Sequence, residues 1–171
     1  MNAGFRAATA LAVLIAMSGA ARAADAIKLR VADSFPKGHF LIKLVIEPWM
    51  EGVRKRTNDA VTFEHYPAQQ LGKATDMLRL TQTGVADIGY VAPAYAAEKM
   101  PVSEVEMLPG AFDHTCQGTL AYWKAARSGV IAEQDYDKNQ IRLLIAVSLP
   151  QYRIFTVKAP VKDTGDVAGL K

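Results

Sequence analysis

Cysteine, histidine and recognisable catalytic motifs are scarce in this sequence. Cys116 is the only cysteine, so the chain has no internal disulfide; its place in a predicted helix favours a packed small hydrophobic residue over a reactive thiol. The three histidines lie on different predicted elements, and their spacing matches no known pattern of zinc ligands. The G-x-S-x-G elbow, the P-loop and the dinucleotide-binding glycine fingerprint are also missing. We therefore expect neither an enzyme nor a bound metal or cofactor.

Apolar runs that approach bilayer length are absent after residue 23, and the run near the N-terminus has the pattern of a secretory signal peptide. Arg6 precedes an apolar stretch over residues 7–20, and Ala21-Arg22-Ala23 forms a small-x-small cleavage site. The alternative, a membrane anchor, is disfavoured because the apolar stretch is short for a bilayer. We predict that residues 1–23 are a cleaved signal peptide and that the protein is exported to the periplasm.

A charge excess of one sign is missing as well. The chain has 20 lysines and arginines against 17 aspartates and glutamates, and Arg6 and Arg22 belong to the predicted signal peptide. The mature chain is therefore close to neutral and has no basic stripe. We expect no binding to nucleic acid or to an anionic membrane surface.

Strand and helix patterns alternate along the rest of the chain. Strands are predicted at 27–34, 60–67, 86–93, 140–148 and 152–158, and helices at 39–57, 73–84 and 113–129. Pro48 predicts a kink or a restart in the first helix, whose apolar face includes Leu44, and Gly84 is placed as the C-cap of the second. The continuous apolar run at 140–148 is typical of a strand that is covered on both faces. This order predicts an α/β fold, mainly a parallel sheet flanked by helices.

Small and aromatic residues gather at the predicted strand ends, where ligands bind to parallel sheets. Residues of these kinds build mostly apolar pockets for small solutes, and the candidates are Ser34, Phe35, Ala92, Tyr95 and Tyr152. Core packing is the alternative interpretation of each aromatic. Arg153 adjoins an apolar strand, and is either a surface residue of a loop or a bidentate clamp on a carboxylate.

Three segments together resemble the extracytoplasmic solute-binding proteins of tripartite ATP-independent periplasmic (TRAP) transporters. They are "LRVADSFPKGH", "YPAQQLGKATDMLRLTQTGVADIGYVAPAY" and "GLK" at 169–171. The family phrase is Y-P-x-x-Q-L-G, a short helix, and G-x-x-D at the entry to a strand, here Tyr66, Pro67, Gln70, Leu71, Gly72, Gly84 and Asp87. The phrase would form the turn between the second strand and the second helix of one lobe, with Gly72 permitting the turn into the helix.

The resemblance implies a type II periplasmic-binding-protein fold of two lobes. Residues 24–150 would form an incomplete first lobe, and residues 151–171 the crossover strand and the start of a second lobe that is largely missing. Family members are roughly twice the mature length of this chain, as two lobes of ordinary domain size require. We therefore expect the chain to be part of a binding protein.

The same resemblance implies that the protein captures an organic acid, often a carboxylate, and delivers it to the TRAP permease in the membrane. Ser34, Ala92 and Tyr95 match positions that line the family's cleft, and Arg153 matches an arginine used by some members. The principal family arginine, in G-L-K-x-R, would fall beyond Lys171. Ala92 and Tyr95 stand where sialic-acid-binding members have charged residues, which favours a less polar or aromatic-tolerant ligand. The alternative function is a ligand-sensing periplasmic domain of a signalling system with the same fold.

Overall fold

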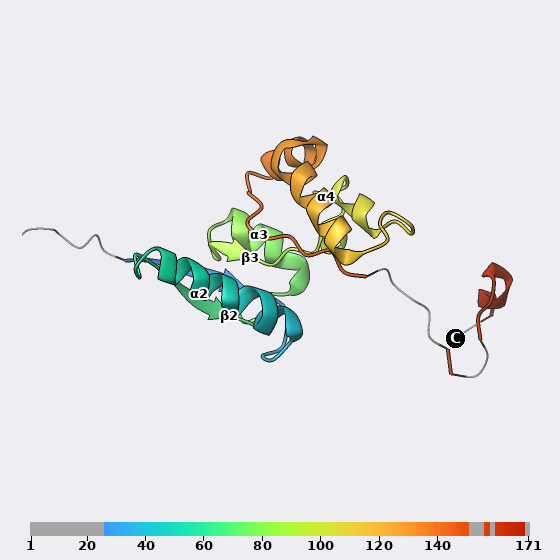
Figure 1. Cartoon of the computed structure of the whole chain (residues 1–171), viewed down its shortest axis with the longest axis horizontal. Coiled ribbons are helices and arrows are strands. Elements are labelled where there is room, and N and C mark those ends of the chain that lie inside the picture. The colour runs from blue at the N-terminus through green and yellow to red at the C-terminus, as the bar shows by residue number, and fades with distance from the viewer. Residues whose placement is uncertain (1–25, 151–155, 158–159, 170–171) are drawn as a thin grey trace, which may run out of the picture.

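The computed structural model describes residues 26–150, 156–157 and 160–169. Within them, three parallel strands form one sheet in the order β2-β1-β3, with β1 at Ile27–Ala32, β2 at Val61–Tyr66 and β3 at Ile88–Gly89. Helix α2 (Glu47–Arg56) follows β1, α3 (Met77–Gln82) follows β2 and α4 (Thr115–Ser128) follows β3 (Figure 1). The predicted class, α/β with a mainly parallel sheet flanked by helices, is confirmed.

Short helical turns connect these elements. Two are π-helical, Ile42–Ile46 and Ala132–Asp137, and four are 3-10 turns, Ala74–Asp76, Pro93–Tyr95, Ser103–Met107 and Thr164–Val167. None of the helices in the described part of the chain is long and apolar enough to span a membrane. The predicted signal peptide, residues 1–23, lies outside the described residues.

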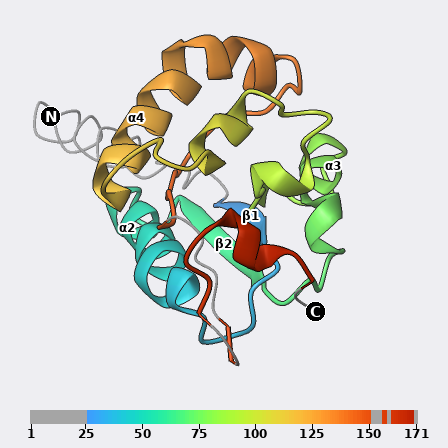
Figure 2. The same ribbon diagram turned by 90° about the vertical axis from the view of Figure 1, so that its right-hand side faces the viewer.

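The helices α2 and α3 pack on opposite faces of the sheet, between which β1 and β2 lie in Figure 2. In the parallel register Leu29 lies opposite Phe63, and the Phe63 ring contacts Trp49 of α2 with centroids 5.3 Å apart. Ala32, which points to the other face because strand side chains alternate, packs in a buried cluster with Met77 and Leu80 of α3.

The expected break at Pro48 is replaced by a change of helix type, because Leu41, Ile46 and Glu47 all keep right-handed helical backbone angles, and this change explains a wrong detail. Pro48 occupies the first turn of α2, where its missing N–H is tolerated, and the π-helical turn Ile42–Ile46 precedes it. A π-helical turn has more residues than an α-helical turn. Side chains in and after it therefore leave the face that a period of 3.6 residues per turn predicts. Leu44, which was expected on the buried face, is therefore 73% exposed.

Arg30 and Asp87 fasten the short strand β3 to β1. The Asp87 carboxylate accepts hydrogen bonds from the main-chain N of Arg30 at 2.8 Å and from its Nε at 3.0 Å. Arg30 Nη2 also donates to the carbonyl of Gly84 at 2.7 Å, and Gly84 has a φ of +70°, as a helix C-cap requires. Gly84 and Asp87, the glycine and aspartate of the G-x-x-D phrase, thus both bind the Arg30 guanidinium. The phrase therefore has a structural role.

A second hydrophobic core surrounds α4. Its buried residues are Leu78 of α3, Met100, Tyr122, Ala126, Ile131, Tyr136 and Leu143. Asp135 is fully buried and accepts from the main-chain N of Ser103 at 2.5 Å, while the Tyr122 hydroxyl donates to Ser103 Oγ at 3.0 Å. Burial raises the pKa of both Tyr122 and Tyr136, so both keep their protons and can donate.

Two sequence predictions in this region are wrong. Residues 140–148 form no strand, because in the described part of the chain no strand pairs with them. An apolar run becomes a strand only when a neighbour completes its hydrogen-bond ladder. Cys116 is exposed rather than packed, because it lies in the first turn of α4 on the side away from the core. The predicted strand at 152–158 lies mostly outside the described residues.

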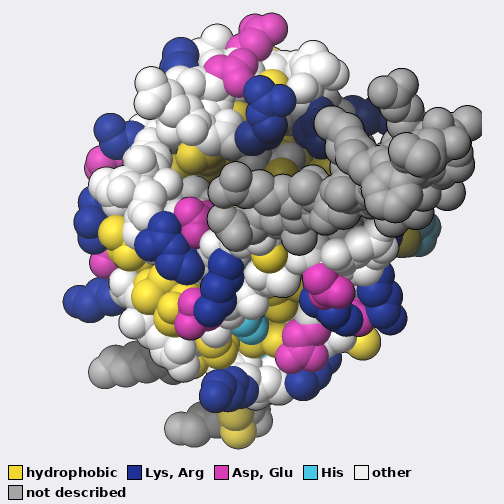
Figure 3. Space-filling model, turned by 90° about the vertical axis from the view of Figure 1, so that its left-hand side faces the viewer, with side chains coloured by type: hydrophobic (Ala, Val, Ile, Leu, Met, Phe, Trp, Pro, Cys, Tyr) yellow, Lys and Arg dark blue, Asp and Glu magenta, His cyan; other side chains and the backbone are white. Residues whose placement is uncertain are grey.

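The surface carries charges of both signs close together. On the face that Figure 3 shows, basic and acidic side chains are interspersed, with apolar side chains between them. Several form exposed ion pairs, such as Lys28–Glu64 at 3.0 Å between β1 and β2 and Lys43–Glu47 at 3.0 Å. Exposed pairs of this kind contribute little to stability.

Candidate functional site

The carboxyl ends of β1 and β3 lie side by side, because the two strands are parallel neighbours. Val31 pairs with Ile88 and Ala32 with Gly89. Ser34 and Phe35 follow β1, and Ala92 and Tyr95 follow β3. The structure therefore brings together four side chains that come from segments far apart in the sequence.

These four residues line one cavity of about 650 Å³, a size suited to a small organic solute. Its wall is mostly apolar and includes Val31, Leu41, Val45, Trp49, Met100 and Val147. Tyr95 is 56% exposed, so it is accessible rather than committed to the core. Arg153 and Tyr152 lie outside the described residues, and their place in the site stays a prediction.

The Phe35 ring is fixed by its aromatic neighbours. It stacks on His39 with centroids 4.3 Å apart and planes at 10°, and it meets Tyr90 edge-on at 4.5 Å. Tyr90 lines the same cavity. Edge-on and stacked pairs orient rings as well as burying them, so this corner presents a rigid aromatic surface.

The "YPAQQLG" turn is hydrogen-bonded to the segment that carries Ser34 and Phe35. The main-chain N of Ala68 donates to the carbonyl of Phe35 at 2.8 Å, and that of Gln69 donates to the carbonyl of Asp33 at 3.0 Å. Ala68 and Gln69 have φ values of 54° and 62°, so the left-handed residues of the turn are these two. Gly72 contributes space instead: a Cβ there would lie 2.7 Å from Leu80 Cδ1.

Glu106 is a lining residue that sequence reasoning missed. Its Oε2 accepts from Ser148 Oγ at 3.0 Å, and burial raises the pKa of its carboxyl group. Asp87 and Arg142 are the other charged lining residues, and Asp87 is paired with Arg30. Glu106 comes from a stretch of weak periodicity, 94–112, so only its acidity in an otherwise apolar environment could have marked it.

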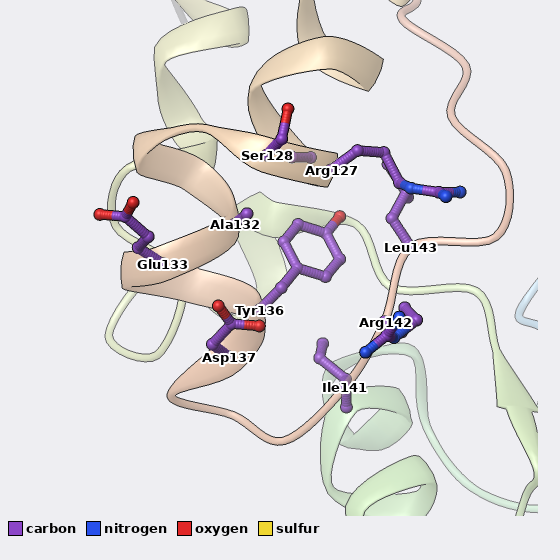
Figure 4. A pocket seen from close by; sticks show the side chains of 10 residues that line it. Arg127, Ser128, Ala132, Glu133, Tyr136, Asp137, Ile141, Arg142 and Leu143 are labelled. Atoms are coloured by element: carbon purple, nitrogen blue, oxygen red, sulfur yellow. The ribbon is translucent and has the colours of Figure 1, made fainter.

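A second, smaller cavity of about 270 Å³ lies between α4, the π-helical turn Ala132–Asp137 and the segment 141–143. Figure 4 shows Arg127 and Arg142 on the side of Leu143, and the Glu133 carboxylate turned away from them. None of the predicted site residues that the structure describes lines it. Across the described residues, no three His, Cys, Asp or Glu side chains gather in a group that could hold a metal ion.

Comparison with known proteins places the chain in a family. The family model "Bacterial extracellular solute-binding protein, family 7" (DctP) matches residues 31–171. A TRAP periplasmic solute-binding protein from Desulfovibrio salexigens is 36% identical, with a TM-score of 0.55 over 60% of this chain and 32% of its own.

Two further solved structures share the fold. A marine metagenome TRAP solute-binding protein specific for aromatic acid ligands, crystallised with 3-hydroxybenzoate, is 25% identical with a TM-score of 0.62 over 66% of this chain and 36% of its own. A TRAP solute-binding protein from Rhodoferax ferrireducens is 24% identical with a TM-score of 0.58 over 63% and 34%. The chain thus spans about a third of the length of these proteins. It belongs to family 7 of the bacterial extracellular solute-binding proteins, and its structural relatives are the periplasmic solute-binding proteins of TRAP transporters.

Proposed function

We propose that the protein captures a small organic acid in the periplasm and delivers it to the membrane permease of a TRAP transporter. One observation carries the proposal: Ser34, Phe35, Ala92 and Tyr95 line a single, mostly apolar cavity at the carboxyl ends of parallel strands. Ligands bind at this edge in open α/β sheets. Family membership supports solute binding as the activity.

The preferred ligand in this proposal is an aromatic monocarboxylate. Phe35 and Tyr90 present oriented ring surfaces, and Tyr95 is an exposed lining residue. Ala92 and Tyr95 add no charge to the lining, so a polyhydroxylated sugar acid would find few partners for its hydroxyl groups there and would lose hydration. The structural relative that binds 3-hydroxybenzoate supports the same ligand class.

Arg153 is the proposed partner of the ligand carboxylate. A guanidinium can hold a carboxylate with two parallel hydrogen bonds, which a lysine ammonium cannot. Of the charged side chains that line the cavity in the described residues, Asp87 and Glu106 would repel an anion and Arg142 is the one cation. Arg153 would add a second cation for the capture of an acid. A charge-assisted hydrogen bond contributes about 1.5–3 kcal/mol, which corresponds to about ten- to a hundredfold in affinity.

The test is calorimetric titration of the purified protein, expressed from its complete reading frame, with benzoate, 3-hydroxybenzoate, mandelate, succinate and galacturonate. We expect the aromatic acids to bind most tightly. Arg153→Ala should weaken that binding by about ten- to a hundredfold, and Arg153→Lys should restore only part of it. Arg127→Ala is the matched control, because Arg127 stacks on Trp123 and lines the other cavity.

Two results would contradict the proposal. If none of the acids binds, the cavity does not serve acid capture. If the acids bind and Arg153→Ala matches Arg127→Ala, another cation holds the carboxylate and the role of Arg153 is wrong.

A further inference from the structure

The pair Asp33–His65 adjoins the segment that carries Ser34 and Phe35, two residues that line the cavity. Asp33 follows β1 and is fully buried, with 0% of its surface exposed. Its Oδ2 lies 2.5 Å from Nε2 of His65, which belongs to β2 and has a side chain only 18% exposed. A carboxylate oxygen only accepts, so His65 Nε2 is the donor. Among the described residues, no lysine or arginine forms an ion pair with Asp33.

The second oxygen of the same carboxylate holds the cavity-lining loop. Asp33 Oδ1 accepts from the main-chain N of Phe35 at 2.8 Å, across Ser34. The Phe35 carbonyl in turn accepts from Ala68. Asp33 therefore links the position of His65 on β2 to the backbone that carries Ser34 and Phe35.

We propose that His65 and Asp33 are positioning residues for ligand binding, which hold Ser34 and Phe35 in the geometry that the ligand meets. The proposal rests on the proposed function, because it assigns Phe35 to the binding site. The physical reason is the cost of a buried carboxylate: once its donor is lost, Asp33 must turn toward water or another donor. Turning it breaks the bond to Phe35 and releases the loop.

An alternative interpretation is that the pair only stabilises the sheet. The alternatives differ in what calorimetry measures, since it gives the dissociation constant and the competent fraction separately. Loss of a merely structural pair lowers the fraction of folded, competent protein and leaves the dissociation constant of that fraction unchanged. Loss of a positioning pair raises the dissociation constant itself at unchanged stoichiometry.

The decisive variants are His65→Phe, which removes the donor, and His65→Gln, which keeps an N–H donor. We expect His65→Phe to raise the dissociation constant for 3-hydroxybenzoate about tenfold, and His65→Gln to stay within about threefold of the wild type. His114→Gln is the matched control, because His114 is exposed before α4. If His65→Phe does not fold, the double variant Asp33→Asn/His65→Phe is measured instead. It has no buried charge and keeps an acceptor for Phe35, so it should bind within about threefold of the wild type, and a larger loss would overturn the positioning role.

Hydrogen exchange gives a readout that needs no ligand. In His65→Phe the amides of Phe35 and Ala68 should exchange faster, while that of Tyr90, which donates to the carbonyl of Ala32 at 2.9 Å, should keep its rate. Equal acceleration of all three, or unchanged binding by His65→Phe, would overturn the positioning role. If the wild type binds no acid, the proposed function fails, and the exchange rates still decide whether His65 holds the loop.

Discussion

Replacing Asp87 by alanine tests whether the G-x-x-D phrase is architectural. Asp87 accepts from Arg30 N at 2.8 Å, Nε at 3.0 Å and Nη2 at 3.1 Å, and its side chain is 31% exposed. β3 has only two paired residues, so these bonds are a large share of what holds it to β1. The substitution should therefore loosen the edge of the sheet that carries Ala92 and Tyr95.

The expected loss of stability follows from the hydrogen bond between the main-chain N of Arg30 and the Asp87 carboxylate. A hydrogen bond to a charged acceptor contributes about 1.5–3 kcal/mol, and the partly exposed guanidinium contact adds little more because water screens it. We expect Asp87→Ala to lower the free energy of unfolding by about 1.5–2 kcal/mol, measured by urea denaturation at neutral pH. Asp87→Asn, which keeps one acceptor oxygen without the charge, should lose less.

The effect should also depend on pH. The Arg30 side chain, followed by its main-chain N–H, lowers the pKa of Asp87 below the ordinary value of 3.8. A lowered folded-state pKa gives stability that is present above 3.8 and is lost as the pH falls through the folded-state pKa. The gap between wild type and Asp87→Ala should therefore close in acid.

The control is Asp113→Ala, which removes an exposed carboxylate. A loss below about 0.5 kcal/mol for Asp87→Ala, the range of ordinary surface substitutions, would refute the reasoning. So would a gap that is the same at about pH 3 and about pH 7.

The three strands of the sheet and the grouping of residues at their carboxyl ends were predictable because their signals are local. Alternation of apolar residues marks β2, and Pro48 and Gly84 mark helix boundaries by their backbone chemistry alone. Parallel strands expose their carboxyl ends at one edge, so Ser34 and Ala92 could be grouped without knowing any contact.

Several features were missed because they depend on a partner distant in the sequence. The apolar run at 140–148 fits a strand, yet a strand exists only where another backbone pairs with it. The pairs Asp33–His65 and Arg30–Asp87 join residues 32 and 57 positions apart, and no periodicity reveals them. The π-helical turn Ile42–Ile46 was missed because the helix template assumes 3.6 residues per turn.

Three further predictions concern export, packing and titration. Exported protein should begin at Ala24 by N-terminal sequencing, and a membrane-bound product that retains Met1 would contradict cleavage. Gly89→Ala would place a Cβ 2.3 Å from Thr81 Oγ1, so Thr81 must move, and urea denaturation should show a loss of about 1–3 kcal/mol. Glu106→Gln should be more stable than the wild type at neutral pH, because burial raises the pKa of Glu106 above its ordinary value of 4.5. A carboxyl group with a raised folded-state pKa favours the native state below its unfolded-state pKa, and that contribution is lost as the pH rises through the folded-state value. Thermal unfolding of both proteins, from the unfolded-state pKa of Glu106 to neutral pH, should therefore show a stability advantage of Glu106→Gln that grows with pH. A stability advantage that does not change with pH would mean that the charge on Glu106 is already compensated inside the cavity.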